Sequence, residues 1–145
     1  MHLGVGVSSS TDGRATPAIN LGLPFGKQYL LSATSAGVQT KAYYHSTYNM
    51  SFLKWMKGSK TLFGETFIGL GAGVHYGVKG IALDPDDEDS EVEKDTDFDI
   101  GPAFRMAVHP FDSFFVGFDF VMGLGAGALG LGFADSGAFA VGVNL

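Results

Sequence analysis

Large apolar residues alternate with small or polar residues along most of the chain, with a period of two. In residues 62–78, one set of alternate positions is mainly apolar, as at Ile68 and Leu70, whereas the other set is mostly glycine with polar residues such as His75. This period is typical of a β-strand whose two faces meet different surroundings. Phe67 interrupts the alternation, because it stands in the set of small residues.

The alternation predicts eight strands. Their expected ranges are 2–9, 15–24, 28–38, 44–56, 61–79, 96–109, 113–125 and 132–145. Short connections are expected at one end of the strands and longer loops at the other. An even number of strands with this arrangement is typical of an antiparallel up-and-down β-barrel. We expect the whole chain, residues 1–145, to form this single domain.

The two faces of these strands indicate what surrounds the barrel. The bulky face is rich in phenylalanine, and the interior of an eight-stranded barrel is only wide enough for ordinary side chains. The other face is mainly Gly, Ala, Ser and Asn, whereas a surface in water normally carries more Lys and Glu. We therefore expect the bulky face to point outward into lipid, which makes the barrel transmembrane. A soluble lipid-carrier barrel, with its bulky face inward, is the alternative.

On this pattern the chain resembles the small eight-stranded outer-membrane β-barrel proteins, such as the OmpA transmembrane domain, OmpX and OmpW. Its last segment, GAFAVGVNL, resembles their alternating C-terminal strand but ends in Leu145 rather than in an aromatic residue. The resemblance implies the outer membrane of a Gram-negative bacterium, contact with membrane lipid or lipopolysaccharide, and periplasmic termini and short turns. No signal-peptide pattern follows Met1, so an exported protein would correspond to a mature form.

Aromatic side chains are expected at the two membrane–water boundaries, where their amphipathic rings are favoured. The expected positions are Tyr29, Trp55 and Phe114 at the short-turn end, and Tyr43, Tyr44 and Tyr76 at the other.

Composition and spacing exclude several functions. The chain has no cysteine for a disulfide or a metal site, and its net charge of −6 argues against a nucleic-acid partner. Gly125, Gly127 and Gly130 form G-x-G-x-x-G, but too few residues follow for a dinucleotide-binding unit. His45 is adjacent to Ser46 and points to the opposite face, so the pair does not form a nucleophilic site. We expect no enzyme activity, no cofactor and no metal site.

An acidic run occupies residues 84–97, with nine carboxylates and one lysine. Asp84, Asp86 and Glu88 have the spacing of a calcium loop, but the sixth position is Asp89 rather than glycine. We expect a solvated loop whose charges repel one another, with weak divalent-cation binding as the alternative.

Charged residues on the inward face are expected to pair within the lumen. Glu65, Arg105 and Asp119 are predicted to form an ion-pair cluster, because a desolvated charge needs a partner. This cluster would either hold the barrel closed or act as the gate of a narrow pore. The other polar residues predicted to face the lumen are Asn20, Asn49, His75 and Asp99.

The outward face of the second to fourth strands is less bulky than elsewhere. Its small residues are Pro17, Ala33, Ser35, Gly37 and Ser46. Small residues allow two proteins to approach closely in a membrane, so a contact between protomers of a homo-oligomer is predicted there.

These observations predict a non-enzymatic outer-membrane barrel, either structural or a narrow channel for small solutes. An eight-stranded barrel is too small for a wide aqueous pore, which needs about 16 strands. A surface adhesion or lipid-organising protein that acts through its loops or a homo-oligomer is the alternative function.

Overall fold

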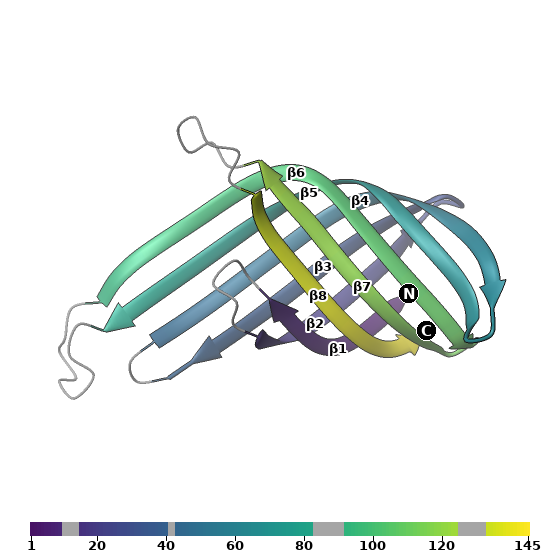
Figure 1. Ribbon diagram of the computed structural model, residues 1–145, viewed down its shortest axis with the longest axis horizontal. Coiled ribbons are helices and arrows are strands. Elements are labelled where there is room, and N and C mark those ends of the chain that lie inside the picture. The colour runs from purple at the N-terminus through teal and green to yellow at the C-terminus, as the bar shows by residue number, and fades with distance from the viewer. Residues whose placement is uncertain (10–14, 41–42, 83–91, 125–132) are drawn as a thin grey trace.

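The computed structural model describes residues 1–9, 15–40, 43–82, 92–124 and 133–145. They form eight antiparallel strands that close into a barrel in chain order (Figure 1). The strands are β1 (His2–Ser9), β2 (Ala15–Phe25), β3 (Tyr29–Gln39), β4 (Tyr43–Thr61), β5 (Gly64–Ala82), β6 (Val92–Phe111), β7 (Phe114–Leu124) and β8 (Phe133–Asn144). Within these ranges no helix is long and apolar enough to cross a bilayer. The predicted eight-stranded antiparallel barrel is confirmed.

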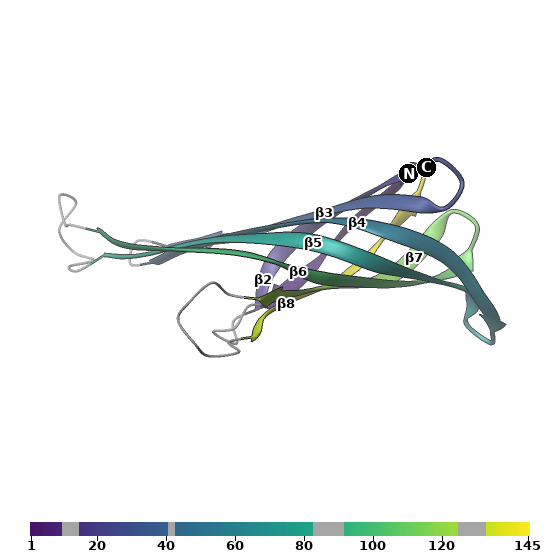
Figure 2. The ribbon, with the colours of Figure 1, turned by 90° about the horizontal axis from the view of Figure 1, so that it is seen from above.

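Three consecutive strands are much longer than the others. β4 and β5 have 19 residues each and β6 has 20, whereas the remaining strands have 8 to 12. Figure 2 shows β4, β5 and β6 reaching beyond the rest of the barrel at the end opposite the two termini. We call this part, formed by residues 43–48, 76–82 and 92–98, the outer extension.

The predicted ranges of β4 and β6 were too short, and the predicted range of β5 (61–79) was displaced by three residues. β4 continues to Thr61 because a register shift between Lys57 and Lys60 absorbs the break in the alternation, as a β-bulge does. The turn into β5 is therefore at Leu62 and Phe63. β6 begins at Val92, so the last part of the acidic run belongs to a strand rather than to a loop.

The barrel closes at a seam between β1 and β8. The backbone nitrogen of Leu145 donates a hydrogen bond to the Met1 carbonyl (2.8 Å), and the Met1 ammonium donates to the Leu145 carbonyl (2.9 Å). A Cβ atom at Gly142 would overlap the carbonyl oxygen of Leu3 on the facing strand. Glycine at this position therefore permits the close approach of the two end strands.

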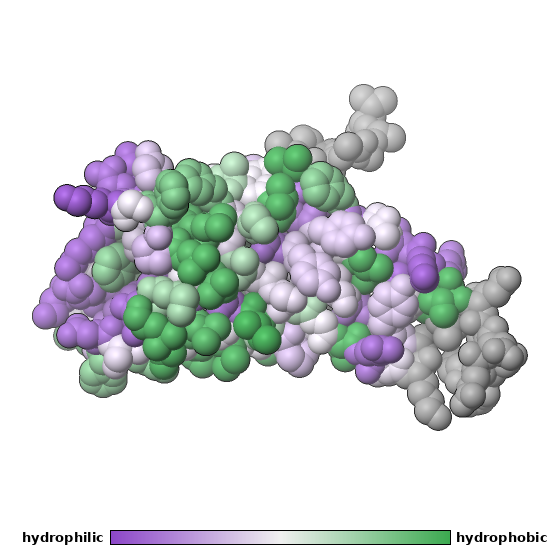
Figure 3. Space-filling model, turned by 180° about the vertical axis from the view of Figure 1, so that it is seen from behind, coloured by the Kyte–Doolittle hydropathy of each residue, from purple (hydrophilic) through white to green (hydrophobic). Residues whose placement is uncertain are grey.

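Apolar side chains cover the outside of the barrel wall. Figure 3 shows them gathered in a belt between the hydrophilic short-turn end and the more polar outer extension. Exposed apolar residues from seven strands are Val5, Ile19, Met50, Phe52, Leu70, Ile100, Phe118 and Phe139. Buried polar residues on the inside are Ser8, Thr16, Asn20, Ser32, Thr34 and Thr47. The bulky face thus points outward, which contradicts the soluble lipid-carrier alternative with its bulky face inward.

Candidate functional site

A buried ion pair lies inside the barrel between β6 and β7. The pairing of these strands places Arg105 opposite Asp119, and both side chains point into the lumen. The Nη1 atom of Arg105, a residue with 0% exposure, lies 3.2 and 3.3 Å from the two carboxylate oxygens of Asp119. The same Nη1 donates to the hydroxyl of Ser32 on β3 (2.6 Å).

Side chains from β2 and β3 complete the environment of the Asp119 carboxylate. The Asn20 amide donates to Oδ2 of Asp119 (2.6 Å) and to Oγ1 of Thr34 (2.8 Å). The Ser32 hydroxyl donates to Oδ1 of Asp119 (3.3 Å). We refer to Asn20, Ser32, Arg105 and Asp119 as the lumen network. It connects β2 and β3 with β6 and β7 directly across the interior, so it braces opposite walls of the barrel.

Five aromatic rings fill the lumen on the short-turn side of this network. They come from five strands and form the aromatic plug, which consists of His2, Trp55, Phe67, His109 and Phe115. The His2 ring lies 5.9 Å from Trp55, 5.2 Å from His109 and 5.2 Å from Phe115, measured between centroids. Phe67 stacks on Trp55 at 5.6 Å and lies 4.7 Å from His109. These contacts join rings from five of the eight strands into one layer.

The lumen network and the aromatic plug contact each other through Arg105. Its guanidinium carbon lies 6.0 Å from the centroid of Trp55 and 5.7 Å from that of Phe115, within the range of cation–π attraction. Nε and Nη2 of Arg105 have no hydrogen-bond partner among the described residues. A buried apolar cluster of Leu30, Leu53, Ala103 and Val121 packs against Trp55. Together these groups pack the lumen at the level of Arg105, where Arg105, Leu53 and Phe115 are fully buried.

Glu65 does not join the lumen network, and this part of the predicted cluster is wrong. β5 pairs with β6 so that Glu65 faces His109 and Gly69 faces Arg105. Glu65 is therefore four residues, or about 13 Å along the strand, from the position beside Arg105. It instead forms an exposed ion pair with Lys57 (2.7 Å) at the short-turn end.

The other polar residues expected in the lumen are all buried. Asn20 belongs to the lumen network, whereas Asn49, His75 and Asp99 lie closer to the outer extension. The Nδ1 of His75 donates to Oδ1 of Asn49 (2.6 Å), and His75 faces Asp99 across the β5–β6 pair. The lumen is therefore polar on the side of the lumen network that faces the outer extension, and aromatic on the side that faces the short turns.

The predicted placement of Trp55 at the membrane boundary is wrong. Trp55 shares its face of β4 with the buried residues Ser51 and Leu53, so it points inward. Tyr29 is exposed as expected and stacks on Phe52 at 5.2 Å. The alternation of inward and outward residues along β4 would by itself have placed Trp55 in the lumen.

The small residues predicted to form a protomer contact lie on the outer wall. Pro17, Ser35 and Gly37 are exposed, and Ala33 and Ser46 are half-buried. Ala33 and Ser35 line a groove of about 300 Å³, which is flanked by Ile19 and Leu21 on one side and by Tyr48 and Tyr76 on the other. The structure thus places two of the five predicted residues in a shallow outer groove, whereas Pro17, Gly37 and Ser46 are not part of its lining.

Two motifs lie outside the described residues. These are the glycines of G-x-G-x-x-G (Gly125, Gly127, Gly130) and the acidic triplet of Asp84, Asp86 and Glu88. Within the part of the chain that the structure describes, no group of three or more His, Asp or Glu side chains is placed to hold a metal ion.

A closed eight-stranded barrel with an apolar exterior has the fold of the small outer-membrane β-barrels. The crystal structure of Ail, the attachment invasion locus protein of Yersinia pestis, in complex with the heparin analogue sucrose octasulfate, is similar over 98% of this chain and 93% of that one, with a TM-score of 0.51 and 11% identity. A second crystal structure of Ail covers 98% and 91%, with a TM-score of 0.46 and 8% identity. No protein-family model and no curated protein matches the sequence. At this identity the likeness shows the fold.

Proposed function

We propose that the protein is a non-enzymatic barrel of the outer membrane of a Gram-negative bacterium, with a structural role and a closed lumen. The observation that carries the proposal is the reversed polarity of the barrel, which has large apolar side chains outside and polar ones inside. Apolar side chains on the outside of a closed barrel are stable in lipid, where closure leaves no unpaired strand edge.

The filled lumen favours a structural role over a channel. The lumen network joins opposite walls through Asn20, Asp119 and Arg105, and the aromatic plug forms a second layer on the short-turn side of this network. An ion that crossed the barrel would have to displace both layers. The narrow-channel alternative therefore requires a rearrangement of these side chains.

Purification in mild detergent tests the membrane assignment. We expect the folded protein to require detergent to stay monodisperse, because the apolar belt would otherwise associate in water. Unheated samples should migrate differently from boiled samples on a gel, since the closed barrel resists unfolding. Full solubility without detergent would contradict the proposal.

The same preparation tests the protomer contact that we propose at the groove around Ala33 and Ser35. We expect light scattering to give the mass of a dimer, because small residues on an outer wall permit close packing between proteins in a membrane. A Ser35→Trp variant should shift the mass to a monomer, whereas Leu70→Trp, on the outer face of β5 away from the groove, should not. A wild-type monomer at all protein concentrations would count against the contact.

Surface adhesion is a second candidate, favoured by the outer extension. The similar structure is described as an attachment invasion locus protein bound to a heparin analogue, which is a polyanion. The described part of this extension instead carries three carboxylates (Glu93, Asp95 and Asp97) against two lysines (Lys79 and Lys94), and Asp97 lies 3.7 Å from Lys79. Residues 84–97 together hold nine carboxylates and one lysine, so the acidic run suits a cationic partner.

Binding to immobilised charged polymers tests whether the outer extension prefers a cationic partner. We expect the detergent-solubilised protein to bind polylysine and not heparin, with binding that weakens as salt rises. Replacing Glu93, Asp95 and Asp97 by their amides should weaken polylysine binding roughly fivefold, given the small contribution of each exposed ion pair. Heparin binding as strong as polylysine binding would contradict a cationic partner.

A further inference from the structure

Two of the five rings in the aromatic plug belong to titratable residues. The rings of His2 on β1 and His109 on β6 lie 5.2 Å apart, and both lie against Phe115 of β7, at 5.2 and 6.2 Å. His2 is 6% exposed and His109 is half-buried. Nδ1 of His2 and Nε2 of His109 are buried without a hydrogen-bond partner among the described residues. These imidazoles therefore pack in the layer as aromatic rings, and each can still take up a proton.

A proton on His2 would place a charge where no described residue offsets it. The charged groups that act on this ring are the Arg105 guanidinium, the Met1 ammonium and His109 when it is protonated. Across the two neighbouring strands His2 faces Gly22 and Asn144, which are uncharged. A buried charge is costly unless an opposite charge pairs with it, and the described residues offer His2 only cations. The packed plug therefore favours the neutral ring.

His109 differs from His2 because a carboxylate lies next to it. The pairing of β5 with β6 places Glu65 directly opposite His109, so the two side chains share one face of the sheet. The charged groups that act on His109 are Arg105 and Glu65, of which Glu65 is the anion. Glu65 lies at the short-turn end, where its side chain is 43% exposed and Lys57 binds its carboxylate (2.7 Å). Arg105 therefore repels a protonated His109 from the side of the lumen network, and Glu65 attracts it toward the short-turn end.

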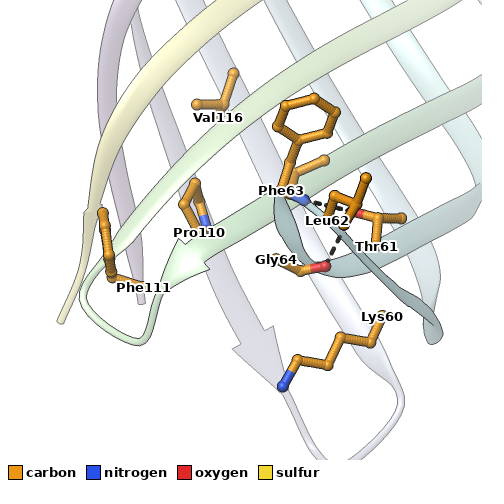
Figure 4. A pocket seen from close by; sticks show the side chains of 9 residues that line it. Lys60, Thr61, Leu62, Phe63, Gly64, Pro110, Phe111 and Val116 are labelled. Atoms are coloured by element: carbon orange, nitrogen blue, oxygen red, sulfur yellow. Dashed lines mark hydrogen bonds between the residues drawn. The ribbon is translucent and has the colours of Figure 1, made fainter.

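The β4–β5 turn fixes the position of Glu65 beside β6. The Thr61 hydroxyl accepts a hydrogen bond from the Phe63 backbone nitrogen (3.2 Å) and donates one to the Gly64 carbonyl (3.1 Å), as Figure 4 shows. Gly64 has a φ of 127°, and a Cβ atom there would overlap the carbonyl oxygen of His109. The turn is thus held against the backbone of β6, so a change of partner at His109 needs only a movement of its side chain.

We propose that the aromatic plug is a proton-sensitive switch, in which a protonated His109 leaves the layer and pairs with the Glu65 carboxylate. With His109 neutral, its ring packs against Phe67 (4.7 Å) and His2 (5.2 Å) and completes the layer. With His109 protonated, the ring moves toward the short-turn end, and the layer loses one of its five members. This inference goes beyond the proposed function, because it requires the closed barrel but no particular role of the protein in the membrane.

The switch consists of an exchange of ion-pair partners and the exposure of one ring. Glu65 exchanges the Lys57 ammonium for the imidazolium, since an exposed ion pair is weak enough to be replaced. Departure of His109 uncovers Phe67, which stacks on Trp55 (5.6 Å), so water gains access to Trp55 from the short-turn end. The lumen network takes no part in this exchange and remains in place.

Acrylamide quenching of Trp55 fluorescence tests the switch, because Trp55 is the only tryptophan in the chain and belongs to the aromatic plug. The folded protein in detergent is titrated from about pH 8 to about pH 4.5, which spans the range in which histidine titrates. We expect the quenching constant to rise severalfold as the pH falls, because the neutral quencher reaches Trp55 only after His109 has left the layer. Unheated samples at both ends of the range must show the gel shift of a folded barrel.

Three variants assign the response to particular side chains. His109→Phe cannot be protonated and keeps a ring in the layer, so its quenching constant should stay low at every pH. Glu65→Gln removes the acceptor for the imidazolium, so its rise should be smaller and shifted to lower pH. His75→Gln is the matched control, because it removes a lumen histidine outside the plug and keeps an amide that can donate to Asn49. It should respond like the wild type.

Four results would overturn the proposal. They are a quenching constant that does not change with pH, a rise that persists in His109→Phe, equal responses in Glu65→Gln and the wild type, and loss of the gel shift at low pH, which would indicate acid unfolding. Dimmer Trp55 emission without greater acrylamide access would also contradict the switch, because it would mean that a protonated His2 beside Trp55 (5.9 Å) quenches within an intact plug. Solubility without detergent would refute the membrane assignment alone.

Discussion

Replacing Arg105 by leucine is expected to lower the free energy of unfolding by about 3–5 kcal/mol. The substitution removes the only cationic partner that the described residues provide for the Asp119 carboxylate, which is then left buried with the neutral donors Asn20 and Ser32. Urea titration of the folded barrel, followed by its gel shift, measures the loss as a lower midpoint.

The double variant Arg105→Leu, Asp119→Leu separates the cost of an unpaired charge from the cost of lost packing. Replacing both members of a buried ion pair by apolar groups is often neutral, so the double variant should recover most of the lost stability. An Arg105→Leu protein within about 1 kcal/mol of the wild type would show that the pair does not brace the barrel.

Truncation of the aromatic plug is expected to open a path for ions. The wild-type protein should give no conductance steps in a planar bilayer, because the aromatic plug and the lumen network close the lumen in series. Trp55→Ala with Phe115→Ala removes two rings and both cation–π partners of Arg105. We expect this variant to show discrete conductance steps, provided that its gel shift confirms a folded barrel.

The Arg105→Leu protein in the same bilayers distinguishes a plug from a gate. It retains all five rings, so we expect it to stay silent. Conductance in Arg105→Leu but not in the double alanine variant would assign the block to the ion pair. Conductance in the wild type would contradict the closed lumen.

The fold was predictable because one periodicity runs through most of the chain. A strand exposed to lipid on one face and to a narrow lumen on the other needs bulky apolar residues and small residues in strict alternation. The strand ends were less predictable. Lys57 and Lys60 flank a register shift, and Val92 starts β6 inside an acidic run, so neither end follows the alternation.

The sequence predicted which residues of the candidate site point into the lumen, but not which residues on neighbouring strands pair with one another. Inward parity identified Arg105 and Asp119, and the β6–β7 pairing places them side by side. Glu65 has the same parity but the wrong depth, because depth depends on which residues pair across strands and not on the sequence of one strand. The aromatic plug was not predicted, although the sequence contains a signal for it. Phe67 and Phe115 interrupt the alternation because they are large residues that point into the lumen.

The β1–β8 seam makes folding of this barrel a non-local process. Its hydrogen bonds join Met1 to Leu145, which are 144 positions apart, so the entropy of closing the longest loop in the chain opposes the last pairing. Until that pairing forms, the outer edges of β1 and β8 carry unpaired backbone groups, which are costly in lipid. High contact order of this kind slows folding, and intermediates with open edges are unfavourable inside a bilayer. We therefore expect ring closure and membrane insertion of this chain to be coupled.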